Sequence, residues 1–175
     1  ANAQFGGLDI LVNNAGIALG KPFEDTTDEE FDRIMAVNVR SVFRTSRAAV
    51  PSLKARGAGR IINLGSIMSG TGGPLLAAYG CSKHAVAGLS KGMACDLGQY
   101  GITVNCICPG PILTGMTARI GESDKEVFAR RRTALRRYGL PEEVAQMTLN
   151  LALPASSFVT GAVIPVDGGL MARNA

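Results

Sequence analysis

The sequence predicts a single α/β domain, residues 1–175, in which a parallel sheet is covered by helices on both faces. Short apolar runs alternate with longer segments of helical periodicity, which is typical of βαβ units. The expected strands, 8–12, 60–64, 102–108 and 162–166, are almost continuously apolar, as in strands buried on both faces. The chain is 46% apolar and 18% charged, a composition typical of one globular core.

The first helix is expected to begin near Thr27, because Thr27 and Glu30 have the spacing of a capping box. A single apolar stripe is predicted to follow it, and an asparagine lies on the same stripe. The members of this stripe are Phe31, Ile34, Met35, Asn38 and Val42.

A longer helix is expected over residues 77–99, and its many small residues allow close approach by neighbouring elements. Residues 111–138 are interpreted as a loop that carries a basic helix. Pro141 is expected to open the last helix, because proline is favoured in the first turn and two glutamates follow it.

The net charge of +4 is concentrated in one arginine-rich segment, residues 130–137. Such a cluster could contact phosphates of nucleic acid or of a carrier-protein prosthetic group, or it could be a solvated helix face. We favour the solvated face and expect no nucleic-acid partner, because aromatic residues are few (5%) and do not alternate with the arginines.

The four cysteines form neither a CxxC pair nor a zinc pattern, so no metal site is predicted. Cys106 and Cys108 alternate within a strand and should point the same way. No apolar run is long enough to span a bilayer, and no leader is visible. We therefore expect reduced thiols, a cytoplasmic location and no membrane partner.

Three polar or glycine-containing segments follow expected strands: residues 13–16, 65–66 and 109–114. Ligands of open parallel sheets bind at the carboxyl ends of the strands. The sequence pattern alone therefore predicts a binding site where these three segments converge.

Tyr79 and Lys83 lie four residues apart on the expected helix and so share one face. A nearby ammonium favours the phenolate and would lower the pKa of the tyrosine, which is ordinarily near 10. Ser66, at a strand end, could hold a substrate oxygen while Tyr79 donates a proton to it. His84 is expected to point away from this face.

Asn38 has two interpretations that the sequence leaves open. It is either a structural asparagine bonded to the backbone, or it holds a water that passes protons toward Lys83. The run Asn13-Asn14-Ala15-Gly16 could likewise turn the chain, or it could let a dinucleotide approach the backbone closely. The Pro109-Gly110 pair is similarly ambiguous, and Thr114 could meet a cofactor through its hydroxyl.

Together these motifs resemble the short-chain dehydrogenase/reductase family, and the match runs in order from Leu8 to Gly169. It is closest to the classical branch, which includes 3-oxoacyl-carrier-protein reductases. The resemblance implies a Rossmann-like three-layer sandwich and NAD or NADP as cofactor, and it implies catalytic roles for Asn38, Ser66, Tyr79 and Lys83. It also implies cofactor contacts from Asn14, Ala15, Gly16, Tyr79, Lys83, Pro109, Gly110, Ile112 and Thr114.

One part of the family pattern is missing from this sequence. The glycine-rich turn of the type TGxxxGxG, which cradles the cofactor pyrophosphate, does not occur. The fold is therefore expected to be truncated to the carboxy-terminal portion, with an open apolar edge at residues 8–12 and weak or no cofactor binding. The residue that selects NAD or NADP is lost with the turn.

The function expected of the complete enzyme is the interconversion of a ketone and a secondary alcohol. The alternative is a non-catalytic fragment or binding protein that retains the half-fold. A homodimer or homotetramer is expected through helix 77–99, by analogy with family members. Substrate specificity is not visible, although apolar residues dominate the two loops expected to shape the pocket, namely Ile67, Met68, Leu75, Leu76, Ile112, Leu113 and Met116.

Overall fold

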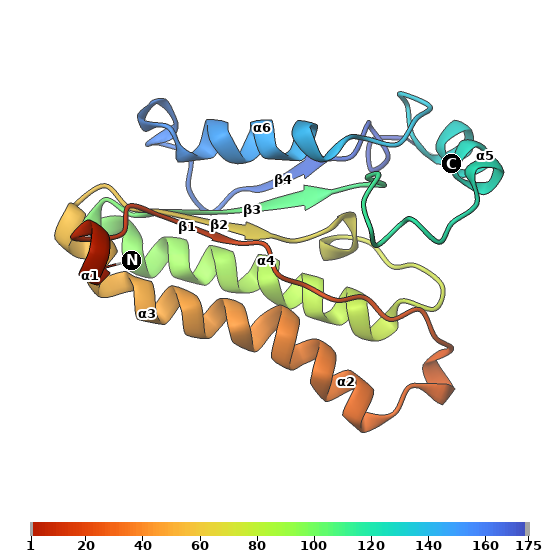
Figure 1. The fold of residues 1–175 in the computed structure, drawn as a ribbon, viewed down its shortest axis with the longest axis horizontal. Coiled ribbons are helices and arrows are strands. Elements are labelled where there is room, and N and C mark those ends of the chain that lie inside the picture. Colours follow the sequence, from red (N-terminus) through yellow and green to blue (C-terminus); the bar gives the residue numbers. More distant parts are fainter. Residues whose placement is uncertain (1, 174–175) are drawn as a thin grey trace.

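A computed structural model, which describes residues 2–173, confirms the parallel α/β fold (Figure 1). The sheet has the strand order β1-β2-β3-β4, and every neighbouring pair is parallel. The strands are β1 (Ile10–Asn13), β2 (Arg60–Leu64), β3 (Thr103–Pro109) and β4 (Val163–Val166). Each begins within two residues of the expected position.

The helices form a layer on each side of the sheet, which makes the expected three-layer sandwich (Figure 1). One layer contains α3 and α4, and the other contains α6. The helices are α1 (Asn2–Phe5), α2 (Asp28–Met35), α3 (Ser41–Arg56), α4 (Ala77–Leu97), α5 (Glu122–Arg132) and α6 (Pro141–Ala152). Within residues 2–173, no helix combines the length and the apolar character needed to cross a membrane.

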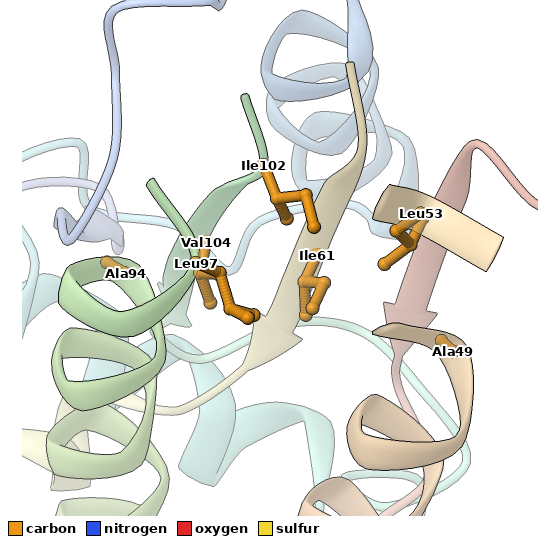
Figure 2. Packing of buried hydrophobic residues seen from close by; sticks show 7 residues of the cluster. All are labelled: Ala49, Leu53, Ile61, Ala94, Leu97, Ile102 and Val104. Atoms are coloured by element: carbon orange, nitrogen blue, oxygen red, sulfur yellow. The ribbon is translucent and has the colours of Figure 1, made fainter. Parts of the chain in front are cut away.

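Adjacent residues of β2 point into two different cores, as the period of a strand requires. Ile61 packs beneath α3 and α4 with Leu53, Ile102 and their neighbours (Figure 2). Ile62 packs on the opposite face with Ile107 of β3 and Leu151 of α6. This two-sided burial explains the continuous apolar character of the strand sequence.

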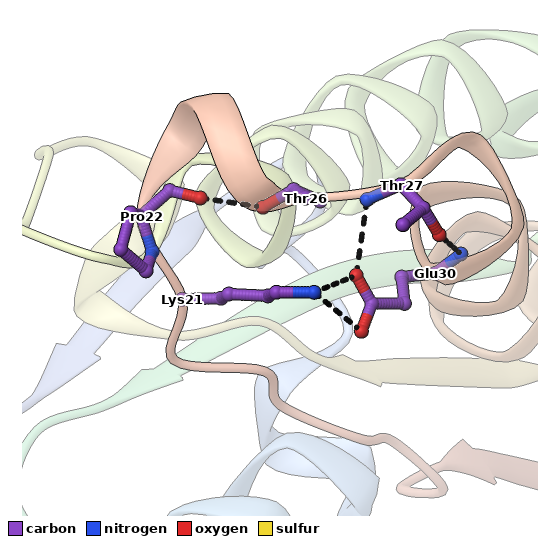
Figure 3. A network of polar contacts seen from close by, with 5 residues as sticks. All are labelled: Lys21, Pro22, Thr26, Thr27 and Glu30. Carbon is purple, nitrogen blue, oxygen red and sulfur yellow. Dashed lines mark hydrogen bonds and ion pairs between the residues drawn. The ribbon is translucent and has the colours of Figure 1, made fainter.

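The connection from β1 to α2 is fixed by the predicted capping box (Figure 3). The backbone N–H of Glu30 donates to Thr27 Oγ1, and the backbone N–H of Thr27 donates to the Glu30 carboxylate. Lys21 forms an ion pair with the same carboxylate at 2.9 Å. The negative charge therefore stabilises the helix start and also anchors the incoming chain.

A π-helical turn, η2 (Ala36–Arg40), joins α2 to α3 within the predicted apolar stripe. The buried positions recur every fourth residue, at Ile34, Asn38 and Val42, on both sides of this turn and within it. Phe31 does not fit this spacing and remains 38% exposed. The predicted stripe is therefore buried at Ile34, Asn38 and Val42 and more exposed at Phe31, where it begins.

The predicted open edge is present at β1, whose neighbour among residues 2–173 is β2 alone. Ile10 and Val12, on the face of β1 opposite Leu11, are 41% and 42% exposed. An unpaired apolar edge of this kind favours association with another strand.

The turn between α4 and β3 depends on one glycine. Gly101 has a φ of +71°, and a Cβ built on it would lie 2.3 Å from the Gly57 carbonyl oxygen. We expect Gly101→Ala to lower the free energy of unfolding by about 2 kcal/mol or more, from backbone strain and steric overlap. Urea unfolding measures this.

Gly98→Ala is the matched control, because Gly98 has helical dihedrals and no atom within 4 Å of its Cβ position. Alanine there should leave stability unchanged or raise it by up to about 1 kcal/mol. Equal effects of the two substitutions would contradict the role of Gly101.

Candidate active site

A cavity of about 380 Å³ lies at the carboxyl ends of β1, β2 and β3. Of the eleven residues predicted for catalysis or cofactor binding, nine line it: Asn14, Gly16, Ser66, Tyr79, Lys83, Pro109, Gly110, Ile112 and Thr114. Ala15 and Asn38 are not among its lining residues. The remaining lining residues are Leu64, Gly65, Met116, Thr117, Pro141 and Val144.

Ser66 lies two residues after the end of β2, in an extended conformation. Gly65 precedes it and allows close packing there, since a Cβ at Gly65 would lie 2.7 Å from Cys106 Sγ and 2.8 Å from Ser69 Oγ. Ser66 then caps a short 3-10 turn, η3 (Ile67–Ser69), where its Oγ accepts from the Met68 N–H at 3.2 Å. The hydroxyl is thereby held at the cavity wall, in a residue that is otherwise buried.

Tyr79 and Lys83 come from adjacent turns of α4 and share a face, as predicted. Lys83 Nζ lies 5.7 Å from the centroid of the Tyr79 ring and donates to the Leu64 carbonyl oxygen at 2.8 Å. Lys83 is only 6% exposed, whereas Tyr79 is half-buried. His84 is exposed, and its Nδ1 lies 2.9 Å from the Gly80 carbonyl oxygen, away from this face.

Burial dominates the acid–base properties of this pair. Desolvation raises the pKa of Tyr79, the Ser66 side chain opposes that rise, and Cys108 adds a smaller increase. Desolvation also lowers the pKa of Lys83. Burial therefore outweighs the lowering of the tyrosine pKa that proximity to Lys83 predicts, and Tyr79 is a protonated phenol at neutral pH.

Asn38 lies outside the cavity and hydrogen-bonds to two segments next to it. Its Oδ1 accepts from the Ile17 N–H at 2.8 Å, and its Nδ2 donates to the Ile17 carbonyl oxygen at 2.9 Å and to Ser82 Oγ at 3.0 Å. These bonds support the structural interpretation of a satisfied buried amide. A Cβ at Gly16 would lie 3.4 Å from Asn38 Oδ1 and 3.5 Å from Lys83 Nζ, so both side chains lie close to this wall.

A buried pair of thiols lies beneath the site, and the sequence predicts only part of its arrangement. Cys106 and Cys108 point the same way, as predicted, and their sulfur atoms are 3.9 Å apart. The hydrogen bond from Cys106 lowers the pKa of the Cys108 thiol, and the same contact together with burial raises the pKa of Cys106. The sequence gives the shared orientation of these cysteines but not their position behind Gly65, which depends on the sheet register.

Fewer apolar loop residues line the cavity than the sequence predicts. Of the seven apolar loop residues expected around the pocket, Ile112 and Met116 line the cavity. Pro141 and Val144, from the first turn of α6, line it as well. The sequence could not place them, because their approach depends on how α6 crosses the sheet.

The arginine-rich segment does not form one continuous unpaired patch. Arg130 pairs with Glu126 at 2.9 Å, and Arg137 pairs with Glu143 at 2.6 Å. The pairing lowers the pKa of the Glu143 carboxyl to about 2. These contacts support the interpretation of this segment as a solvated, ion-paired surface.

A cavity at the carboxyl ends of the strands, in a parallel sheet with helices on both faces, is the place where doubly wound α/β folds bind their ligands. The family model described as enoyl-(acyl carrier protein) reductase matches residues 1–171. The chain belongs to the short-chain dehydrogenase/reductase family.

Individual relatives agree with this assignment. The chain is 44% identical to a cyclopentanol dehydrogenase of Comamonas sp., over 95% of this chain and 67% of the relative. It is 37% identical to a D-beta-hydroxybutyrate dehydrogenase of Rhizobium meliloti, over 97% and 70% respectively. A gluconate 5-dehydrogenase from Burkholderia cenocepacia, solved with NADP and tartrate, superposes with a TM-score of 0.94 at 35% identity and is covered over 68% of its length.

Substitution of Lys83 tests whether this buried lysine contributes to the stability of the fold. We expect Lys83→Met to change the free energy of unfolding at pH 7 by less than about 1 kcal/mol, because removing a desolvated ammonium offsets the lost hydrogen bond to Leu64. The lowered pKa of Lys83 means that the folded state binds this proton less tightly than the unfolded state. Wild-type stability should therefore gain a contribution as pH rises toward 10.5, and the variant should lack it.

Urea unfolding of both proteins across this pH range measures the difference. Leu53→Ala, at a fully buried core position, is the control and should lose about 2–5 kcal/mol. A loss of that size for Lys83→Met would show that the lysine stabilises the fold.

Proposed function

We propose that this chain carries the proton-transfer half of an NAD(P)-dependent oxidoreductase that interconverts a ketone and a secondary alcohol. The observation that carries the proposal is the convergence of Ser66, Tyr79 and Lys83 on one cavity. A bound nicotinamide would supply the hydride for reduction, or accept it in the reverse reaction.

The three side chains divide the remaining work. Tyr79, protonated at neutral pH, donates its phenolic proton to the carbonyl oxygen during reduction and takes it back during oxidation. Ser66 donates a hydrogen bond that holds the same substrate oxygen. Lys83 places a positive charge beside the phenol, which stabilises the phenolate that forms when the proton leaves.

Asn38 takes a supporting part in this proposal. Its amide joins the Ile17 backbone to Ser82, whose hydroxyl donates in turn to the Tyr79 carbonyl oxygen at 2.7 Å. Asn38 thus connects the segment after β1 to the turn that carries Tyr79. The proton-relay role that the family resemblance implies for Asn38 remains part of the proposal.

The cavity fits the nicotinamide end of a dinucleotide. Gly16 and Gly110 line it with backbone atoms, and Asn14 and Thr114 contribute polar groups to the lining. Its volume of about 380 Å³ is at the small end of the range for ligand sites. The sequence offers no TGxxxGxG turn for the pyrophosphate, so we expect these residues to hold the nicotinamide and its ribose.

The substrate class is proposed from the lining of the cavity and from the relatives. Ile112, Met116 and Val144 give it an apolar wall. Cyclic or short-chain secondary alcohols, of which cyclopentanol and 3-hydroxybutyrate are examples suggested by the names of the relatives, suit this mixture of an apolar wall and one hydroxyl-binding group.

Turnover and binding test the function together. We expect NAD(H) or NADP(H) to bind this chain with a dissociation constant weaker than micromolar by isothermal titration, because the phosphate turn is missing. At saturating cofactor, oxidation of cyclopentanol or 3-hydroxybutyrate should be detectable by nicotinamide absorbance. Tyr79→Phe should reduce it by about 10²- to 10⁴-fold, because the proton donor is lost.

Tyr100→Phe is the matched control, because Tyr100 is exposed at the far end of α4 and should not affect turnover. Unchanged turnover in Tyr79→Phe would refute the catalytic assignment. A wild-type chain that binds no cofactor and turns over none of these alcohols would favour the alternative, a non-catalytic binding protein.

We also propose that a second copy of the chain packs against α4. Its outward face carries Cys81, Gly88, Gly92 and Cys95, all exposed, and neither glycine has an atom within 4 Å of its Cβ position. Such a face allows another helix to approach closely. Gly88→Arg should therefore shift the species seen by sedimentation velocity toward the monomer, whereas a wild-type chain that is already monomeric would contradict the proposal.

A further inference from the structure

Ser69 lies behind the site, where it joins two residues of the catalytic group. Its Oγ donates to the Lys83 carbonyl oxygen at 2.9 Å and accepts from the Ser66 backbone N–H at 3.2 Å. Ser69 is buried and does not line the cavity. It therefore contacts the main chain of both neighbours without access to a substrate.

The surrounding structure leaves space for this one hydroxyl. A Cβ at Gly65 would lie 2.8 Å from Ser69 Oγ, so only glycine at that position accommodates the hydroxyl without displacement. Cys106 Sγ and Cys108 Sγ enclose the same point, at 2.7 Å and 3.0 Å from the Gly65 Cβ position. Packing on this side therefore restricts where Ser69 Oγ can lie.

The segment from β2 to η3 forms two hydrogen bonds with Lys83. Leu64, before the turn, accepts from Lys83 Nζ at 2.8 Å, and Ser69, after the turn, donates to the Lys83 carbonyl oxygen. Ser66 lies between these two bonds. Its position relative to α4, and hence to Tyr79, is fixed on both sides.

We propose that Ser69 is a positioning residue, which sets the distance between the Ser66 hydroxyl and the Tyr79–Lys83 face of α4 through its two backbone hydrogen bonds. This inference rests on the proposed function for its catalytic meaning. The effect of Ser69 on the position of Ser66 relative to Tyr79 can be measured in the chain without any assay of turnover.

The test follows the titration of Tyr79 by NMR in the full chain with ¹³C-labelled tyrosine. The chain has three tyrosines, and the Tyr79 signal is identified by its loss in Tyr79→Phe. The Ser66 side chain opposes the rise in the pKa of Tyr79, so displacing Ser66 should raise that pKa further. We expect Ser69→Ala to move the midpoint of the Tyr79 titration to higher pH.

Removing Ser69 could also act on Tyr79 through Cys108, and this second route must be blocked. Cys108 raises the pKa of Tyr79, and the Ser69 side chain in turn lowers the pKa of Cys108. Lys83 and Cys106 face the same region. The comparison is therefore made between Cys108→Ala and the double variant Cys108→Ala/Ser69→Ala, with the lysine and the other cysteine unchanged.

Ser90→Ala is the matched control for a lost buried hydroxyl on the same side of the sheet. Ser90 is fully buried in α4, accepts from Asn63 Nδ2 at 2.8 Å and donates to the Val86 carbonyl oxygen at 2.7 Å, away from Ser66. Ser90 also hydrogen-bonds Cys106 and lowers the pKa of that thiol, so its removal on the same background reports any effect that reaches Tyr79 through Cys106. Ser90→Ala should lower stability, and the Tyr79 titration should move further in Ser69→Ala than in Ser90→Ala. If Ser69→Ala does not fold, Ser69→Cys keeps a similar volume and weakens the donor.

Hydrogen exchange of the Ser66 amide provides the second readout. It should accelerate roughly five- to tenfold in the Ser69 variant, because that amide loses its acceptor. Faster exchange with an unmoved Tyr79 titration would overturn the positioning role and leave Ser69 as a structural residue. A shifted titration in a chain that binds no cofactor would support the inference while refuting the proposed function.

Discussion

The close packing of α4 on β2 and β3 is the constraint on which the rest of this structure depends. Most buried residues of α4 are small or polar, with Val86 and Leu97 as the larger apolar exceptions, and the contact brings Lys83 within hydrogen-bonding distance of Leu64. Gly65 permits the same approach at the end of β2, where any side chain would meet sulfur or hydroxyl atoms. A larger residue in this contact would separate the helix that carries Tyr79 from the turn that carries Ser66.

Polar groups at this interface are paired across elements, which lets the close contact remain buried. Asn13 Nδ2 donates to Asn63 Oδ1 at 2.8 Å, and Asn63 Nδ2 donates to Ser90 Oγ at the same distance. These bonds join β1, β2 and α4 in one row. Because an unpaired buried polar group costs about 1–3 kcal/mol, the row favours a single alignment of helix and sheet.

Much of this arrangement could be predicted from the sequence, for identifiable reasons. The two central strands, β2 and β3, are predictable because two-sided burial makes them almost continuously apolar, and the Thr27–Glu30 cap is predictable because its chemistry is local. Tyr79 and Lys83 could be paired from helical spacing alone. The π-turn at Asn38, the contribution of α6 to the cavity and the effect of burial on Tyr79 could not be predicted, since each depends on packing between distant segments.

The central claim is that the residues of the cavity bind the nicotinamide end of a cofactor. Nicotinamide mononucleotide tests it most directly, because it needs no dinucleotide phosphate turn. In a titration of the ¹⁵N-labelled chain, we expect the largest amide shifts at the residues that line the cavity, namely Gly16, Ser66, Lys83, Gly110 and Thr114. Shifts centred elsewhere, or none at millimolar ligand, would contradict it.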